Sequence, residues 1–195
     1  MEGIEQIDRA ITLWINNLFP SWTDSFWQLL SNTQVWFPFY ALFIGFIFWK
    51  LGWKKGLAVT LSIVLMVVLA DQFSNLIKYA VKRYRPCYDP WLVSNGLRLP
   101  YGLHGLGKYG FFSAHAGNTF GFAAVTWWGL KWNKPQADFR PWGWFIFIWA
   151  ALVSVSRIMM GAHFLGDISV GCLVGLGFGY ACARLARWAV VKAKL

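Results

Sequence analysis

The chain has 195 residues, about the size of one domain. Hydrophobic residues make up 57% of it and charged residues only 13%, roughly half the charged share of an average soluble domain, which excludes a disordered chain and argues against a soluble globule. The net charge of +10 does not indicate nucleic acid as the partner, because the basic residues are spaced between long apolar runs; membrane lipids are the expected partner.

The predicted elements begin with an amphipathic helix in the first 33 residues. Apolar residues recur there at helical spacing with polar residues opposite them, so we expect a helix that lies on the outer membrane surface. The apolar set is Ile4, Ile7, Ile11, Trp14, Ile15 and Leu18, and the polar set is Glu5, Asp8, Arg9 and Asn16. Acidic residues stand where a signal peptide would be positive, which argues against one. We therefore divide the chain into interfacial helices (1–33) and a transmembrane domain (34–195).

Five apolar runs in the second part predict five transmembrane helices. The runs are residues 35–49, 56–77, 109–130, 141–156 and 168–183. A bilayer core of about 30 Å needs about 20 helical residues, so the two shorter runs must extend into their flanks. The predicted fold class is therefore all-α, an integral membrane helical bundle of about five spans with an N-terminal amphipathic helix.

The positive-inside rule sets the expected orientation. With the C-terminus in the cytoplasm, the inner segments hold slightly more lysine and arginine than the outer ones, and most of the outer basic residues form one cluster near residues 78–85. Between the second and third spans, residues 86–110 are rich in proline and glycine and predict a long external loop. Arg98, His104 and Lys108 in this loop are candidate contacts to a second phosphate or a sugar.

Two features inside the spans are interpreted as structural. Gly171, Gly175 and Gly179 recur every four residues in the last span, a pattern typical of close helix packing. Asp71, inside the second span, is expected to pair with a polar group between helices, since intramembrane acids usually pair within a bundle.

The first candidate site motif ends the second span. Lys78 and Arg85 are seven residues apart, two helical turns, so they project from one face. Two cations on one face form a receptor for a phosphate. A basic patch that contacts lipid headgroups is the alternative.

The second motif is Ser113-Ala114-His115, at the predicted start of the third span. Backbone N–H groups at a helix start, together with a serine hydroxyl, make an anion cradle. His115 can exchange a proton beside that anion, although a histidine at a helix start is often structural.

The third motif lies between the last two spans and contains Arg157, His163 and Asp167. His163 and Asp167 are four residues apart and meet on one face of a helical turn. A carboxylate that accepts the Nδ1–H of an imidazole leaves Nε2 free as base or nucleophile. Arg157 adds a guanidinium for the same anion. A purely structural His–Asp pair is the alternative.

In this order the motifs K-x6-RP, SAH and SR-x5-H-x3-D resemble the three-part signature of the type 2 phosphatidic acid phosphatase superfamily, which also includes bacterial acid phosphatases and vanadium haloperoxidases. The first and third motifs match at every fixed position. The second departs from the family pattern PSGH, since Phe112 replaces the proline and Ala114 the glycine. The motif region, 78–167, covers just under half of the chain.

The resemblance implies a metal-independent lipid phosphatase without a cofactor, and the sequence has no Cys/His or carboxylate cluster with metal-ligand spacing. It implies that His163 attacks phosphorus and forms a phosphohistidine, that Asp167 orients His163, and that His115 protonates the leaving oxygen and then activates water. The implied phosphate-binding residues are Lys78, Arg85, Ser113, Ala114 and Arg157.

Candidate substrates in the family are undecaprenyl diphosphate, phosphatidylglycerol phosphate, phosphatidic acid and lipid A phosphates. Two other functions are open: a lipid phosphotransferase, in which an acceptor replaces water at the phosphohistidine, and a non-enzymatic phospholipid transporter that uses the basic cluster as a phosphate site. The haloperoxidase branch is typically soluble, so five spans argue against it. We expect an integral protein of a bacterial inner membrane whose site faces the periplasm.

Overall fold

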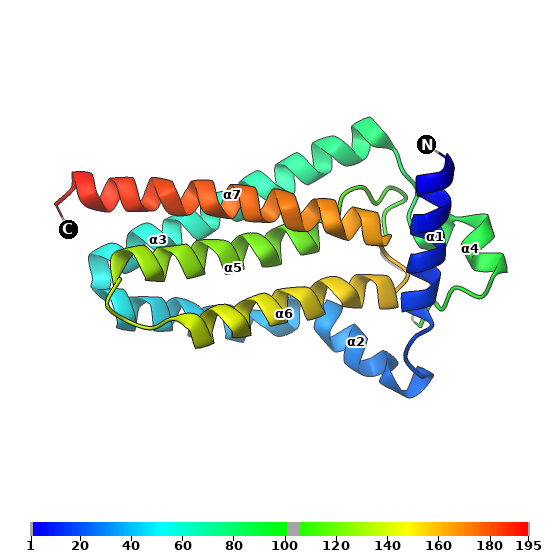
Figure 1. Ribbon diagram of the computed structural model, residues 1–195, viewed down its shortest axis with the longest axis horizontal. Coiled ribbons are helices and arrows are strands. Elements are labelled where there is room, and N and C mark those ends of the chain that lie inside the picture. Colours follow the sequence, from blue (N-terminus) through cyan, green and yellow to red (C-terminus); the bar gives the residue numbers. More distant parts are fainter. Residues whose placement is uncertain (1, 101–105, 195) are drawn as a thin grey trace.

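The computed structural model describes residues 2–100 and 106–194, and within them it is a bundle of helices without a strand. The long helices run along the molecule and the short ones gather at one end (Figure 1). The helices are α1 (Glu2–Asn16), α2 (Asp24–Ser31), α3 (Phe37–Val81), α4 (Pro90–Ser94), α5 (Ala114–Asn133), α6 (Arg140–Met159) and α7 (Leu165–Lys192), with 3-10 turns η1 (Ser21–Thr23), η2 (Thr33–Trp36) and η3 (Pro86–Tyr88). The predicted all-α class is confirmed, and the 86–110 loop contains two short helical elements that its composition did not predict.

Helix α3 contains two spans joined by a reversal at Gly52. The backbone there leaves the helical conformation with φ 74° and ψ 174°, which glycine adopts without a Cβ clash. In Figure 1 the residues before Gly52 run to the end that carries the C-terminus, and those after it run back. The first two predicted spans, 35–49 and 56–77, lie on the two arms of this hairpin. Between the arms and the neighbouring helices α5 and α6 lies an apolar core that includes Phe43, Phe122 and Trp149.

Helix α5 is the central helix, since it packs on α3, α6 and α7. Its contact with α7 is close because glycines face each other. A Cβ on Gly175 would lie 2.2 Å from the Gly117 oxygen, and one on Gly179 would lie 2.6 Å from the Gly121 oxygen. The interpretation of the α7 glycines as a packing face is confirmed, and this close approach aligns the starts of α5 and α7.

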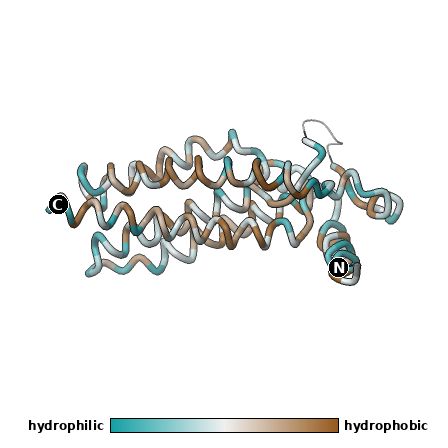
Figure 2. Tube along the Cα trace, turned by 90° about the horizontal axis from the view of Figure 1, so that it is seen from above, coloured by the Kyte–Doolittle hydropathy of each residue, from teal (hydrophilic) through white to brown (hydrophobic). Residues whose placement is uncertain are grey.

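Three stretches are long and apolar enough to cross a bilayer: Thr33–Val81, Arg140–Met159 and Leu165–Lys192. Helix α5 falls outside this set because it carries small and polar residues that face other helices instead of lipid. Large apolar side chains elsewhere point outward, Leu42, Leu173 and Trp144 among them, as a surrounding hydrocarbon phase allows. Figure 2 shows the hydrophobic residues along the length of the bundle and hydrophilic ones towards its ends. The exact count of five spans stays a prediction.

Helix α1 lies across the end of the bundle, next to α4 (Figure 1). Its polar residues face the bundle: Thr12 and Asn16 are fully buried, and Asn16 Nδ2 donates to the backbone oxygens of Ile158 and Met159. Its apolar residues Ile4 and Trp14 are exposed. The helix is amphipathic as predicted, and its polar face binds backbone groups at the end of α6 and at the start of α7.

Candidate active site

The three sequence motifs meet at the end of the bundle that α1 covers. The α3 hairpin ends there, α5 and α7 begin there, and α6 ends there (Figure 1). Each motif therefore lies on a helix terminus or on the loop next to one. The structure brings together all eight predicted site residues: Lys78, Arg85, Ser113, Ala114, His115, Arg157, His163 and Asp167.

His163 and Asp167 face each other in a buried position. The side chain of Asp167 is fully buried and that of His163 is nearly so. The distance from His163 Nδ1 to Asp167 Oδ2 is 3.4 Å, and the backbone N–H of Phe164 donates to the same Oδ2 over 3.1 Å. This second contact holds Asp167 at the first turn of α7, so the carboxylate lies on the Nδ1 side of the ring.

Arg85 faces the other ring nitrogen of His163. Its Nη1 lies 2.8 Å from His163 Nε2 and donates to the Ala162 oxygen over 2.9 Å, while its Nε donates to the Gly107 oxygen. A guanidinium can only donate, so Nε2 must accept and the ring proton belongs on Nδ1. This is the tautomer in which Nε2 carries the lone pair that a nucleophile needs.

The environment of His163 favours its neutral form. Burial holds the pKa of His163 well below its ordinary value, and the positive charges of Arg85, Arg157 and Lys78 act in the same direction. Burial also lowers the pKa of Arg85. Three positive charges therefore lie near one imidazole, and a phosphate dianion bound there would neutralise most of this positive charge.

Ser113 is the N-cap of α5 and lies against the first turn of α7. Its hydroxyl oxygen accepts from the backbone N–H of Ala116, and its own backbone N–H donates to the backbone carbonyl oxygen of Asp167 over 3.0 Å. Ala114 is the first residue of the helix. The N–H groups of this turn are the predicted anion cradle. Phe112, which departs from the family pattern, is buried and lies near Phe73 and Gly117.

Two side chains from the α2–η2 segment also reach the site, and the sequence analysis missed both. Thr33 Oγ1 lies 3.2 Å from His115 Nε2, and Arg157 Nη1 donates to Ser31 Oγ. No local signal marks Ser31 or Thr33, because their approach depends on how the N-terminal segment folds over α6.

A third missed residue is Arg83, which pairs with Asp167 through Nη1 over 2.7 Å. Arg83 lies within the first motif, between Lys78 and Arg85, at a position that the motif leaves variable. A cation two residues from Arg85 was the available signal, but only the structure shows that it faces the carboxylate.

Other charged residues at this end have structural partners. Asp71 Oδ1 accepts from Asn118 Nδ2 over 2.9 Å, which confirms the expected pairing between helices. Arg98 pairs with Asp24 and donates to the Phe19 backbone oxygen, so it ties the loop to the N-terminal segment. Its contact with substrate stays a prediction. Lys108 lies over the Tyr84 ring. His104 lies outside the described residues.

An apolar cavity of about 460 Å³ opens beside His115. Its walls come mainly from the α2–η2 segment, the two arms of α3 and α5, and its polar lining includes Ser31, Thr33, Asp71, His115, Asn118 and Thr119. The apolar lining includes Phe37, Ile44, Ile63, Val67 and Phe122. A volume of this size is in the range of ordinary ligand pockets. The cavity therefore borders the cluster of predicted site residues at His115 and Ala114 and is otherwise lined mainly by apolar side chains.

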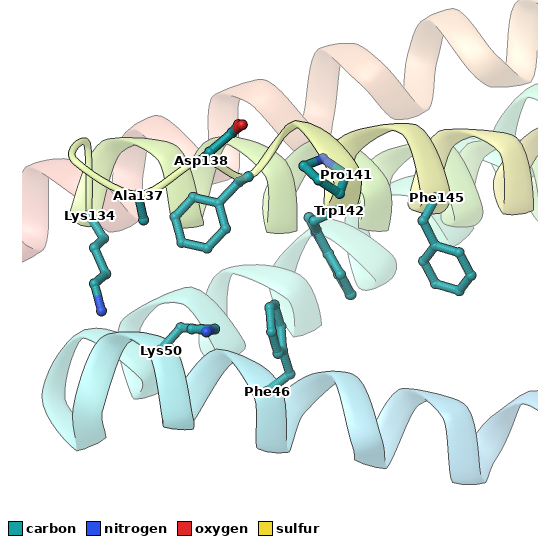
Figure 3. A pocket seen from close by; sticks show the side chains of 9 residues that line it. Phe46, Lys50, Lys134, Ala137, Asp138, Pro141, Trp142 and Phe145 are labelled. Carbon is teal, nitrogen blue, oxygen red and sulfur yellow. The ribbon is translucent and has the colours of Figure 1, made fainter.

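The opposite end of the bundle holds a different cavity, of about 400 Å³ (Figure 3). Lys50 and Lys134 point into it, from the first arm of α3 and from the segment after α5, and Trp142 and Phe46 line it. No predicted site residue lies there. Basic residues that the sequence assigns to the cytoplasmic side therefore lie at the end away from the motifs.

The sequence is similar to those of known membrane phosphatases. The sequence model of the PAP2 superfamily matches residues 56–190. A lipid A 4'-phosphatase of Porphyromonas gingivalis is 33% identical over 183 residues, which cover 92% of this chain and 73% of that protein. A lipid A 4'-phosphatase of Bacteroides thetaiotaomicron is 29% identical over 182 residues, covering 92% and 76%.

Two solved structures share the fold. The first is a transmembrane PAP2 type phosphatidylglycerolphosphate phosphatase from Bacillus subtilis, with a TM-score of 0.68, 18% identity, and coverage of 94% of this chain and 86% of that chain. The second is LpxE from Aquifex aeolicus, with a TM-score of 0.64, 23% identity, and coverage of 90% and 93%. The family-model match covers well over half of the chain, so the protein belongs to the PAP2 superfamily.

Proposed function

We propose that this protein removes a phosphate from lipid A through a phosphohistidine intermediate on His163, at the periplasmic face of a bacterial inner membrane. It is an integral membrane lipid phosphatase by its family and its relatives. The observation that carries the proposed chemistry is the placement of His163 between Asp167 on its Nδ1 side and Arg85 on its Nε2 side. A transporter would need a phosphate site but not this pair.

In the first step, the Nε2 lone pair of His163 attacks phosphorus. The bond between phosphorus and the lipid oxygen breaks, its electrons stay on that oxygen, and His115 supplies the proton. Asp167 stabilises the positive charge that develops on the imidazole of His163. Arg85, Arg157, Lys78 and the turn at Ser113–Ala114 neutralise the charge on the phosphate oxygens, the main requirement of phosphoryl transfer.

In the second step, water attacks the phosphohistidine. His115, now neutral, takes a proton from the water, and the P–N bond breaks to release phosphate and the free His163. The two steps together add water across the P–O bond without a change of oxidation state, so the reaction requires no cofactor and no redox partner. Among the described residues no group of His, Cys, Asp or Glu is placed to hold a metal ion. Activity without metal stays a prediction.

The cavity beside His115 supports a lipid substrate. Its walls are mainly apolar, and its polar lining includes the predicted site residue His115. An acyl chain in this cavity would bring the phosphate of the same molecule to the cationic cluster. The names of the two relatives favour lipid A over the other candidate lipids.

The proposed orientation rests on charge. Lys50 and Lys134 lie at the end opposite to the motifs (Figure 3), and the positive-inside rule assigns basic ends to the cytoplasm. The site then opens to the periplasm, where lipid A is accessible in the outer leaflet.

Phosphate release by the purified protein tests the proposal. The panel is lipid A, phosphatidic acid, phosphatidylglycerol phosphate and undecaprenyl diphosphate in detergent micelles, with excess chelator present and with His163→Ala as control. We expect fastest release from lipid A, no loss with chelator, and no release by the variant. A normal rate for His163→Ala would refute the nucleophile, and loss of activity with chelator that magnesium restores would refute metal independence. Transfer of phosphate to an added alcohol in place of release would identify a phosphotransferase.

A further inference from the structure

One arginine outside the motif positions connects the catalytic pair to the N-terminal helix. Arg83 Nη1 donates to Asp167 Oδ1 over 2.7 Å, and Arg83 Nη2 donates to Asp8 Oδ2 over 2.7 Å. Its guanidinium lies 4.0 Å from the centre of the Phe164 ring. The guanidinium is therefore held on three sides, by α1, by the first turn of α7 and by the residue before that turn.

These contacts determine which Asp167 oxygen faces His163. Oδ1 is bound by Arg83, while Oδ2 accepts from the Phe164 backbone and faces His163 Nδ1. The carboxylate cannot rotate without giving up the ion pair. A fully buried carboxylate also needs a counter-charge, because an unpaired buried charge is strongly destabilising.

Arg83 differs from the three cations of the phosphate site. Both of its terminal nitrogens are bound by carboxylates, whereas those of Arg85 and Arg157 contact His163 and Ser31, neither of which is an acid. Burial alone would lower the pKa of Arg83, but Asp167 and Asp8 outweigh it and hold that pKa above its ordinary value. Arg83 is thus charged at every pH at which the enzyme would be assayed.

We propose that Arg83 is a positioning residue of the reaction: it keeps Asp167 ionised and turned towards His163, and it does not contact the phosphate. The inference rests on the proposed function, since it assumes that His163 is the nucleophile and that Asp167 orients it. Asp8 Oδ2 accepts from Nη2 of the same guanidinium, and Asp8 Oδ1 accepts from the backbone N–H of Gly166 over 2.9 Å. Asp8 therefore anchors α1 without reaching the catalytic pair.

The test compares Arg83→Gln, Arg83→Lys and Asp8→Asn in the detergent-solubilised full chain. The substrate is lipid A, or the panel lipid that the wild type hydrolyses fastest. We expect Arg83→Gln to lower kcat by about 10- to 100-fold, as loss of an outer partner of a reactive histidine commonly does, and to change KM less than threefold or so. Arg83→Lys keeps the charge but cannot bridge two carboxylates, so its kcat should lie between that of the wild type and that of Arg83→Gln.

Asp8→Asn is the matched control because it breaks the same bridge at its other end. Its melting temperature should fall less than that of Arg83→Gln, because Asp167 keeps its counter-charge, and its kcat should stay within about threefold of wild type because the Arg83–Asp167 contact remains. Equal losses of kcat in the two variants would mean that the bridge only holds α1 in place, and would overturn the proposal.

A double-variant cycle separates positioning from general stabilisation. If Arg83 acts through Asp167, then Arg83→Gln should lower kcat no further in an Asp167→Asn background. If the fold-loss of kcat in the double variant equals the product of the fold-losses in the two single variants, the proposal is overturned. Should Arg83→Gln fail to fold, the same cycle with Arg83→Lys decides the question. An active His163→Ala would instead show that the proposed function has failed, whatever the Arg83 variants do.

Discussion

Gly175 lies where the backbone of α7 passes closest to that of α5, and substituting it should damage both stability and catalysis. A Cβ at this position would lie 2.2 Å from the oxygen, 2.9 Å from the carbonyl carbon and 3.0 Å from the Cα of Gly117. Ordinary contact begins at 3.4 Å, so Gly175→Ala must separate the two backbones by about 1 Å. Backbone cannot rotate away as a flexible side chain can, so the helices themselves must move.

The magnitude follows from this separation. Overpacking of a well-packed contact costs about 1–3 kcal/mol, which corresponds to about 2–4 °C of melting temperature per kcal/mol for a chain of this size. The same shift moves Asp167 at the start of α7 away from Ser113 at the start of α5, whose backbones are joined by a 3.0 Å hydrogen bond. A displacement of about 1 Å in a catalytic arrangement can cost about 100-fold in rate.

The assay is thermal unfolding of the detergent-solubilised protein together with kcat/KM for lipid A. Gly177→Ala is the matched control, because it lies on the same helix and a Cβ there would meet nothing within 4 Å. We expect Gly177→Ala to behave as wild type. If Gly175→Ala behaves like Gly177→Ala in both measurements, the close α5–α7 contact does not position the site.

Three further predictions concern the site and its orientation. His163→Ala should lower kcat by at least about 10,000-fold, and Arg157→Gln by about 100- to 1,000-fold, because we propose His163 as the nucleophile and Arg157 as a cation that neutralises the transferring group. Near-normal single-turnover rates in quenched-flow assays would contradict these roles. The pKa of His163 lies well below its ordinary value, so the proposed nucleophile stays neutral as the pH falls. After correction for the ionisation of the substrate, kcat/KM should therefore not fall between pH 7.5 and about 6.5 through protonation of His163. A loss of kcat/KM centred near pH 6.5 would indicate a histidine with an ordinary pKa and would contradict this prediction. Cys87 is buried, and burial raises the pKa of its thiol, so it should not react with a thiol reagent from either side of the membrane. An impermeant thiol reagent on intact spheroplasts should label Ser94→Cys, at the end of α4, and should not label Gln136→Cys, at the opposite end of the bundle. Labelling of Gln136→Cys alone would show that the orientation is inverted.

Much of the site could be predicted from sequence because each part of its chemistry is local. Two cations two helical turns apart, a serine and a histidine at a helix start, and a His–Asp pair one turn apart each have a meaning that depends only on nearby residues. Their common order identified the superfamily, which the family match confirms. Composition alone indicated a membrane protein, since hydrocarbon tolerates the outward apolar residues that water does not.

The rest depended on contacts between residues far apart in the chain. Arg83 was one of several basic residues in a cluster until Asp167, 84 positions later, proved to face it. Ser31 and Thr33 reach the site because the N-terminal segment folds over α6, and polar residues of α1 turned inward because helix ends there offer backbone groups to bind. Sequence by itself determined which residue types carry the chemistry, through spacing along single helices. The tertiary structure decided which carboxylate oxygen faces which nitrogen, because that depends on partners from α1, from the segment after α3 and from the start of α7, which meet only in the folded bundle.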